Sequence, residues 1–316
     1  MLELTNTFEG DKINWLFGGT VYSMSGESWS ENLTTSAVIS TQIEKYRETW
    51  YSLYGQAEYQ YSDNLQFFAG GQMIKVTAIA EKFVPRVGAI YQFTPEFGIK
   101  ALYSEAFRAA SHFESKFNFP PIVSGNPNLT PETVTTLDLQ LFYHTSDYQL
   151  AATYFNSSQQ DLVLIRPSGK PNSTISSFVN EDKIDFEGFE LEAKVISWDD
   201  LLVVASLTYQ INENYAGQEN FTTVPNFMAK FGISYDFNYW FSAGLFNNYF
   251  SKGHDVSVKF PGTKYVNPEP DAFNLMTLNF NVNLGNWLNM DNTFMLTGYI
   301  YNLLDEDIYA PEFNRA

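Results

Sequence analysis

Long segments in which apolar and polar residues alternate restrict this chain to one class of fold. In the segment 201–212 every second residue is apolar, and the residues between them turn polar from Ser206 onward. A period of two places neighbouring side chains on opposite faces of a β-strand. The pattern recurs in 137–144, 148–154, 189–195 and 227–235, and no segment has a comparable helical period. The sequence therefore predicts an all-β fold.

The strands indicated by this pattern are long. We expect about 14 of them, most of roughly 10 to 13 residues, where a usual strand has about 5 or 6. Strands of this length, tilted by about 45°, cross roughly 25 Å, the height of the apolar band of an outer-membrane barrel. The predicted fold is thus an antiparallel transmembrane β-barrel with these strands: 1–8, 12–23, 49–61, 65–77, 82–93, 96–106, 133–145, 147–156, 184–196, 200–212, 225–236, 239–251, 272–284 and 292–302.

The predicted connections alternate in length, as they do in membrane barrels. Tight turns alternate with long polar loops at about 24–48, 107–132, 157–183, 213–224 and 252–271. Aromatic residues lie in or beside the short turns, where they would form a girdle at the membrane interface. They are Trp198, Trp240, Trp287, Phe93, Phe97, Tyr148, Tyr235 and Tyr239.

The alternation also predicts which face of each strand meets lipid. We expect these apolar side chains to point outward: Leu137, Leu139, Leu141, Leu150, Ala152, Leu191, Ala193, Val203, Leu207, Phe231 and Ile233. The inward set is charged and comprises Lys100, Asp138, Glu190, Glu192 and Lys230. A mixed-charge inner face indicates a wet or plugged lumen rather than a dry core.

Composition excludes several function classes. The 316 residues carry 18 Lys+Arg against 36 Asp+Glu, a formal charge of −18, so we expect no nucleic-acid partner. The chain has no cysteine and only His112, His144 and His254, so neither a metal site nor a cofactor is expected. No P-loop, G-x-S-x-G or H-E-x-x-H motif occurs, and the chain is not expected to be an enzyme.

The start of the sequence favours the interpretation that this chain is a piece of a longer protein. The start, at 1–8, has neither the basic region nor the apolar core of a signal peptide and reads like the middle of a strand. The longest aliphatic run is 201–205, where a membrane-spanning helix needs roughly 20 residues. The alternative is a cytosolic protein.

Four short segments carry motifs that follow one another along the chain. Residues 103–111 read YSEAFRAAS, 125–132 read GNPNLTPE, 186–192 read FEGFELE and 301–309 read YNLLDEDIY. They resemble the "YSxxFRAPS", "GNPxLxPE", "GxExE" and "NLxDxxY" segments in the C-terminal half of the β-barrel of TonB-dependent outer-membrane receptors, with Ala110 where that family usually has proline. The residues that carry this similarity include Tyr103, Phe107, Arg108, Gly125, Asn126, Pro127, Pro131, Glu132, Asn302 and Asp305.

The resemblance implies a 22-stranded barrel closed by an N-terminal plug that carries a box contacting TonB. On this interpretation residues 1–316 are a partial barrel, roughly strands 8 to 21, without plug, TonB box, signal peptide or last strand. It further implies location in the bacterial outer membrane, contact with lipid, and uptake of a scarce, bulky small molecule. A ferric siderophore is the first expectation; cobalamin, haem and oligosaccharides are others.

Two other functions remain open from the sequence. A passive outer-membrane channel of 14 strands fits the strand count directly. A soluble β-rich carbohydrate-binding or adhesin module explains the aromatic residues and the acidity, but not the alternation of short turns and long loops.

The long loops supply the candidate ligand contacts. If they form the external mouth of a receptor, their aromatic and polar side chains are placed to touch the ligand. These candidates are Trp29, Phe113, Phe117, Arg166, Tyr215 and His254.

Parity on two strands predicts one specific contact. Counting from Lys100 along 96–106 brings Arg108 to the inner face, and counting back from Asp138 along 133–145 does the same for Glu132. The 107–132 loop joins these antiparallel strands, so Arg108 and Glu132 should meet across its base, with Lys100 near Asp138 and Gln140.

Overall fold

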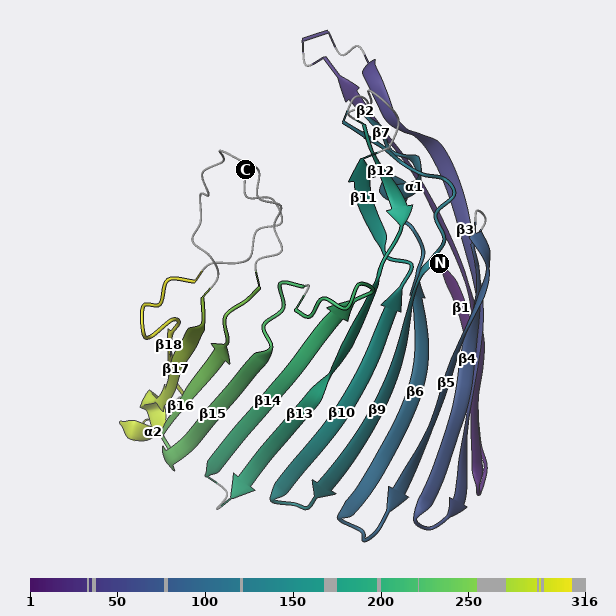
Figure 1. Cartoon of the computed structure of the whole chain (residues 1–316). Coiled ribbons are helices and arrows are strands. Elements are labelled where there is room, and N and C mark those ends of the chain that lie inside the picture. Colours follow the sequence, from purple (N-terminus) through teal and green to yellow (C-terminus); the bar gives the residue numbers. More distant parts are fainter. Residues whose placement is uncertain are drawn as a thin grey trace. The chain divides into compact units, whose positions relative to one another are not determined.

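The computed structural model contains fourteen long strands in one sheet, which confirms the predicted strand count (Figure 1). It describes residues 1–32, 34–35, 38–76, 79–119, 122–167, 175–197, 200–220, 222–254, 271–288, 290 and 293–308. The order in the sheet is β1-β2-β3-β4-β5-β6-β9-β10-β13-β14-β15-β16-β17-β18. Their bounds are β1 Leu2–Glu9, β2 Ile13–Glu31, β3 Val38–Ser62, β4 Leu65–Val76, β5 Ile79–Gln92, β6 Phe97–Arg108, β9 Glu132–His144, β10 Tyr148–Gln160, β13 Lys183–Ser197, β14 Leu201–Asn214, β15 Phe227–Asn238, β16 Phe241–Phe250, β17 Phe273–Asn283 and β18 Met295–Ile300.

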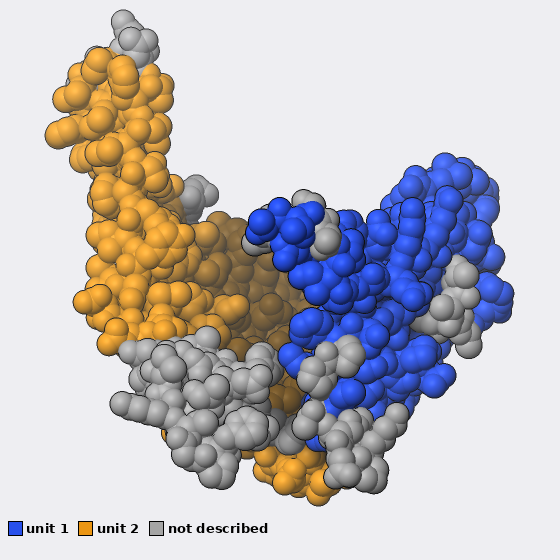
Figure 2. All heavy atoms as spheres, turned by 90° about the horizontal axis from the view of Figure 1, so that it is seen from above, with its two compact units in different colours: residues 1–91, 101–137, 157–185 blue, residues 92–100, 138–156, 186–316 orange. Residues whose placement is uncertain are grey.

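The chain divides into two compact units, which are treated separately below (Figure 2). The first comprises residues 1–91, 101–137 and 157–185, and the second comprises 92–100, 138–156 and 186–316. β1 and β18 stand at the two ends of the strand order, as expected of a sheet that does not close on itself.

In the first unit, the prediction of a loop over 24–48 is wrong. β2 and β3 are 19 and 25 residues long, and their antiparallel pairing continues from Ile13↔Tyr59 to Glu31↔Val38. Irregularities in register occur at Gly26/Ser28, Ser28/Trp29 and Ser30/Glu31. Most residues in the outer part of this hairpin are polar and its apolar residues do not alternate regularly, so the period of two fades although the hydrogen-bonded ladder continues.

Two other predicted loops of this unit contain regular structure. The 107–132 segment folds into helix α1 (His112–Lys116) and strands β7 (Asn118–Phe119) and β8 (Val123–Ser124), and the 157–183 segment into β11 (Val163–Pro167) and β12 (Ser176–Asn180). These strands form a second sheet in the order β11-β12-β8-β7, with β12 and β8 parallel. Strands of two residues are too short for a periodic signal, so this sheet was not expected.

In the second unit, register separates an apolar face from a polar one. Val203, Ile233, Leu245, Leu278 and Ile300 are directly paired across five strands and form one apolar row. Ser206, Lys230 and Asn248 form a row on the opposite face. On β9 the outward candidates Leu139 and Leu141 are 45% and 44% exposed, while the amide of Gln140 donates to Thr153 of β10 at 3.0 Å. The predicted alternation is confirmed on these strands.

Aromatic side chains gather at the short turns, as predicted. Phe93 and Phe97 stack at 5.1 Å between ring centroids, and Trp240 and Trp287 stack at 5.8 Å. Trp198 lies outside the described residues. The turn after β17 contains a helix that was not predicted, α2 (Leu284–Trp287). Nowhere in the described ranges is a helix long and apolar enough to cross a membrane.

The two faces should tolerate charge differently. Replacing Leu139 or Leu207 by Arg should lower the free energy of unfolding by about 2–4 kcal/mol, because each puts a charge against lipid. Gln140→Arg should cost no more than its lost hydrogen bond, about 0.5–1.5 kcal/mol. Denaturant unfolding of the full-length protein in lipid vesicles measures both, and equal costs would contradict the face assignment.

Candidate functional site

Arg108 and Glu132 meet as predicted, in a bidentate ion pair at the base of the 107–132 segment. The Nε of Arg108 donates to Oε2 of Glu132 at 2.6 Å, and Nη2 donates to Oε1 at 2.7 Å. Arg108 ends β6 and Glu132 begins β9, so the pair joins the two strands where the loop leaves the sheet. Two parallel charge-assisted bonds make this geometry more specific than a single contact.

A third partner, Glu114, was not predicted. Nη1 of Arg108 donates to Oε2 of Glu114 at 2.8 Å, and Nη2 donates to Oε1 at 3.0 Å. Glu114 also belongs to a capping box at the start of α1, in which Oε2 accepts from the Ser111 amide at 2.7 Å. Partial burial opposes ionisation of Glu114, but the bonds from Arg108 and Ser111 outweigh it, so its pKa is lowered. The S-x-x-E spacing of Ser111 and Glu114 is the sequence signal of this helix start.

Glu132 extends the junction to the neighbouring segment. Its Oε1 also accepts a hydrogen bond from the Val163 amide, at the start of β11, at 2.7 Å. Arg108, Glu114 and Glu132 therefore connect β6, α1, β9 and β11. We call these three residues the arginine junction.

The other side of α1 rests on β3 through a partly buried histidine, His112. The ring of His112 lies 3.5 Å from that of Tyr46, and its Nε2 lies 3.2 Å from Oε2 of Glu48, without the alignment of a hydrogen bond. Burial lowers the pKa of His112, a shift that Glu48 opposes and Lys116 reinforces. The Nζ of Lys116 lies 5.4 Å from the centre of the Tyr46 ring. Helix α1 is thus held on two sides.

The family-like segment 125–132 packs the small sheet against α1. The side-chain amide of Asn126 donates to the Phe178 carbonyl at 2.9 Å, and its oxygen accepts from the Asn128 amide at 3.0 Å. A Cβ on Gly125 would lie 2.7 Å from the Lys116 nitrogen and 2.8 Å from that of Phe117, so only glycine fits there. Pro127 is exposed, and Pro131 directly precedes β9.

Four phenylalanines form a cluster on helix α1 and the small sheet, which together we call the α1 platform. Phe113 and Phe117 lie 4.4 Å apart between centroids, Phe119 lies 6.2 Å from Phe117, and Phe178 packs edge-on at 5.7 Å against Phe113. Phe178 is buried, whereas Phe113 and Phe119 remain 47% and 39% exposed. The structure therefore brings together two of the predicted ligand contacts, Phe113 and Phe117, on a fixed base.

The other predicted contacts lie apart from this cluster. Arg166 of β11 pairs with Glu181 at 2.8 Å, and Trp29 is half exposed on the β2–β3 hairpin. Tyr215 and His254 belong to the second unit. His254 is partly buried, and its Nε2 lies 2.6 Å from Oδ1 of Asn226.

The remaining motif residues have structural contacts. Tyr103 donates to Glu105 at 2.6 Å, and Phe107 is partly buried near the end of β6. Asn302 and Asp305 have positive φ values of 49° and 53° after β18. The Asn302 side chain bonds both the amide and the carbonyl of Glu306, which closes a tight turn.

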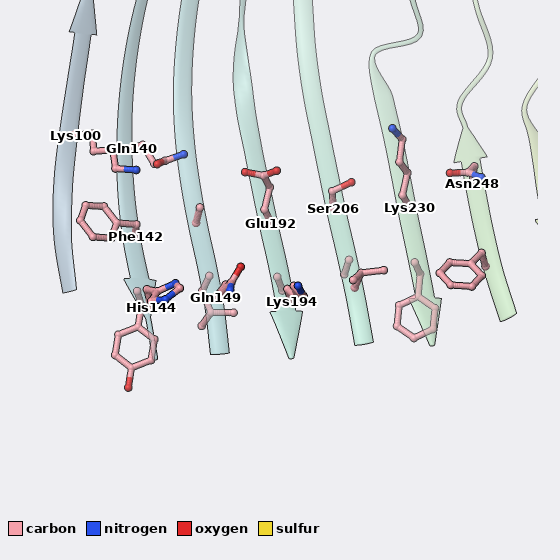
Figure 3. A pocket seen from close by; sticks show the side chains of 18 of the residues that line it. Lys100, Gln140, Phe142, His144, Gln149, Glu192, Lys194, Ser206, Lys230 and Asn248 are labelled. Atoms are coloured by element: carbon pink, nitrogen blue, oxygen red, sulfur yellow. The ribbon is translucent and has the colours of Figure 1, made fainter. Parts of the chain in front are cut away.

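The polar face of the second unit contains a pocket of about 800 Å³ (Figure 3). Its wall includes Lys100, Lys194 and Lys230 with a single carboxylate, Glu192. The Nζ of Lys100 lies 4.8 Å from the centre of the Phe142 ring, and the described residues show no ion pair of Lys100 with Asp138, so that predicted proximity did not become a contact. The pocket is therefore locally basic in an acidic chain, and apolar side chains such as Phe142 and Phe246 also line it.

Coupling within the arginine junction can be measured. Arg108→Ala and Glu132→Ala should each speed proteolysis of the 107–132 loop in the full-length protein. Their effects should fall short of additivity by about 0.5–3 kcal/mol, because either change breaks the same bidentate pair. The exposed pair Arg166/Glu181 is the matched control, with an expected coupling of about 0–1 kcal/mol. Strict additivity at Arg108 and Glu132 would contradict the junction.

Gly125→Ala should destabilise the packing of the 125–132 segment against helix α1. The added methyl group meets backbone atoms of the end of α1, which cannot rotate away, and overpacking of this kind costs about 1–3 kcal/mol. Proteolysis within 107–132 reports the loss. Gly55→Ala is the control, because its nearest neighbours would be 3.6 and 3.8 Å from the new Cβ. Equal protease resistance of both variants would contradict the close approach.

Comparison with known proteins identifies the architecture. Residues 2–303 match the family model "TonB dependent receptor-like, beta-barrel". The chain is 22% identical to the iron-regulated outer membrane virulence protein of Vibrio cholerae, over 92% of this chain and 46% of that protein. It is 27% identical to the heme/hemopexin utilization protein C of Haemophilus influenzae, over 35% of this chain and 19% of that protein.

Solved structures show the same fold. The pyoverdine-bound FpvA of Pseudomonas aeruginosa superposes with a TM-score of 0.75 at 15% identity, over 97% of this chain and 44% of that chain. The ferric enterobactin receptor PfeA of the same organism, in its complex with enterobactin, gives 0.74 at 14% identity, over 96% and 48%. The copper transporter OprC gives 0.72 at 16% identity, over 99% and 52%.

The chain spans less than half the length of the curated relatives it matches. The family match nevertheless covers nearly all of its own residues, including every strand of the large sheet. The chain therefore belongs to the TonB-dependent receptor family of the bacterial outer membrane, as part of its β-barrel domain.

Proposed function

We propose that the full-length protein is an active-transport receptor that takes up a scarce, bulky solute, with a ferric siderophore as the foremost candidate. The family is not enzymatic and binds TonB and iron chelates. The observation that carries the proposal is the family match over residues 2–303. The V. cholerae relative is iron-regulated, and FpvA and PfeA are siderophore receptors, which supports an iron chelate as the solute.

The platform around α1 is the proposed capture surface. Its exposed rings, Phe113 and Phe119, offer apolar faces that suit a large, partly aromatic chelate. The buried Phe178 and the arginine junction hold these rings on a base tied to β6 and β9. A prearranged surface loses less conformational entropy when a ligand binds.

The polar face supplies a path suited to a hydrated solute. Lysine, carboxylate and amide side chains lie among the apolar residues that line the pocket on the second unit, so a polar chelate could exchange its water for protein contacts there. Energy would come from TonB, which the resemblance places at an N-terminal plug and box. In this mechanism the residues of this chain bind, orient and line the path, and iron is cargo.

Heme and copper are alternative substrates, each supported by a protein that this chain resembles. The Haemophilus relative is a heme/hemopexin utilization protein, and OprC is a copper transporter. The family assignment favours a receptor over the passive channel and over the soluble module considered from the sequence.

Deleting residues 112–122 should abolish uptake. The deletion removes α1 and the rings of Phe113, Phe117 and Phe119, while β6 and β9 keep their ladder. Uptake of radiolabelled iron as ferric enterobactin, as ferric pyoverdine and as haemin is compared in cells with the intact receptor, the deletion and no TonB. Outer-membrane abundance and heat-modifiable gel mobility check that the deleted receptor still inserts.

The outcomes distinguish a role of the α1 segment in uptake from the TonB-dependent transport function of the whole receptor. Loss of one TonB-dependent uptake activity in the inserted deletion variant supports the proposal. Normal transport by that variant removes the α1 platform from the mechanism. Uptake that persists without TonB contradicts active transport.

A further inference from the structure

Helix α1 is held from two sides that differ in chemistry. Glu114 joins it to the arginine junction, and His112 joins it to Tyr46 and Glu48 of β3. His112 and Glu114 are two residues apart, which is about 200° around a helix, so the two contacts leave α1 in opposite directions. The junction consists of charged groups, whereas the contact on β3 depends on a partly buried imidazole. We call this contact, formed by His112, Tyr46 and Glu48, the histidine contact.

Neighbouring residues fix the β3 side of the histidine contact. The Glu48 side chain is 11% exposed, and its Oε2 accepts a hydrogen bond from Nε1 of Trp50 at 3.3 Å. The same oxygen lies 3.2 Å from Nε2 of His112. Across the ladder Gly26 pairs with Tyr46, and a Cβ on Gly26 would lie 2.9 Å from the Tyr46 hydroxyl oxygen, so glycine leaves room for the ring. The carboxylate and the ring are therefore positioned by β2 and β3 themselves.

This site accommodates His112 better as a neutral ring than as a cation. Nε2 of His112 is shielded from water and has no aligned hydrogen-bond partner among the described residues. A second proton on the ring would place a charge there without an aligned acceptor. Glu48 attracts that charge, and Lys116, one turn along α1, repels it. Burial is the largest influence, and the pKa of His112 is lowered.

Few charged groups lie at the histidine contact. Glu48 and Lys116 are those that act on His112 in the part of the chain that the structure describes, and Nζ of Lys116 lies 5.4 Å from the centre of the Tyr46 ring. β7 and residues 125–126, which adjoin α1, carry no charge. The other charged residues in the outer parts of β2 and β3 are exposed: Glu27, Glu31, Glu44, Lys45 and Arg47. Attraction and repulsion thus come from one group each, and burial decides the sign.

From this arrangement we infer that the histidine contact is a pH-dependent switch: α1 is docked on β3 while His112 is neutral and leaves β3 when His112 binds a proton. The physical reason is that an imidazolium regains its hydration only by leaving the site. An undocked His112 has the ordinary pKa of about 6.5, and a docked one has a lower pKa. Docking is therefore strongest above about pH 6.5 and weakens as the pH falls below it, by up to about tenfold per pH unit, because one proton is bound.

The arginine junction keeps its charges over the same range. Partial burial opposes ionisation of Glu114 and Glu132, but the hydrogen bonds from Arg108 outweigh it, so both pKa values are lowered from 4.5. Between about pH 4.5 and 6.5 the junction therefore stays ionised while the histidine contact opens. The Asn126 amide donates to the Glu114 carbonyl at 2.9 Å and keeps α1 attached to the 125–132 segment. Acidification thus frees one side of α1 only.

One consequence for the ligand rests on the proposed function. Phe113 follows His112 on α1, so undocking moves an exposed ring of the capture surface away from its fixed position. The affinity of the receptor for ferric enterobactin should then fall by up to about tenfold between about pH 7.5 and 5.5. His112→Gln, which stays neutral, should remove this loss and controls for any effect of pH on the chelate itself. Equilibrium binding to the full-length receptor in lipid vesicles measures both.

The distance between two spin labels tests the switch without any ligand. The 316 residues contain no cysteine, so Thr41→Cys on β3 and Asn118→Cys on β7, both exposed, give one labelled pair. The full-length receptor, with any cysteine outside these residues replaced by serine, is reconstituted in lipid vesicles. Pulsed electron paramagnetic resonance at about pH 7.5 should give one narrow distance. At about pH 5.5 a displaced population should grow by up to about tenfold relative to the docked one.

Two variants and a control assign the effect to His112. His112→Gln should keep the narrow distance at both pH values. Glu48→Gln should show at least as large a change between the two pH values as the natural protein, because the group that attracts the proton is gone. His254→Gln is the matched control and should retain the natural pH dependence, since His254 contacts Asn226 in the second unit.

Three results would overturn the inference. The first is a distance distribution that is the same at both pH values, and the second is a pH dependence that persists in His112→Gln. The third is a distance that becomes narrower in acid, which would mean that an ion pair with Glu48 outweighs burial. The label measurements need no transported solute, so their failure is distinct from failure of the proposed uptake function.

Discussion

The need to pair every backbone N–H and C=O inside a bilayer governs the rest of this structure. Lipid offers no hydrogen-bond partners, so a chain that crosses it with strands must pair each one along its length. The fourteen strands in consecutive antiparallel order meet that need with short connections on one side. The alternation of side chains follows, because lipid accepts only the apolar face and the polar face must be directed away from it.

Beyond the hydrogen-bonded strands of the large sheet, side-chain hydrogen bonds hold the chain in place. Where β6 ends and β9 begins, Arg108 donates four hydrogen bonds to the carboxylates of Glu114 and Glu132, and Glu132 accepts a fifth from the Val163 amide. Asn126 and Asn180 bind the backbone of neighbouring segments in the same way. These polar links tie the segments that carry the Phe113 cluster to one another and to the large sheet. The family-like residues of this region therefore have a structural role that can serve ligand capture indirectly.

At the opposite ends of the strands, aromatic contacts replace polar ones. Tyr235, Phe237, Phe241, Trp240 and Trp287 touch in sequence, and Trp287 starts a segment with large exposed apolar side chains. The two ends of the wall thus differ in chemistry. The side with long loops is organised by charge and amides, as water allows, and the side with short turns by rings, as an interface favours.

The sequence by itself determined the number of strands in the large sheet, their two faces and the meeting of Arg108 with Glu132, because a period of two and strand parity are local properties. It missed the outer parts of β2 and β3, where that period fades. The small sheet, the phenylalanine cluster of Phe113, Phe117, Phe119 and Phe178, and helix α2 were decided only by tertiary structure. The strands β7 and β8 have two residues each and exist because β12 pairs with β8 across about fifty residues of chain, a contact without a local signal. Likewise, Glu114 contacts Arg108 because the start of α1 lies beside the end of β6. His254 contacts Asn226 because the segments that precede β15 and follow β16 lie together. Contacts between distant segments depend on where each loop leaves the wall, and that is a property of the folded chain.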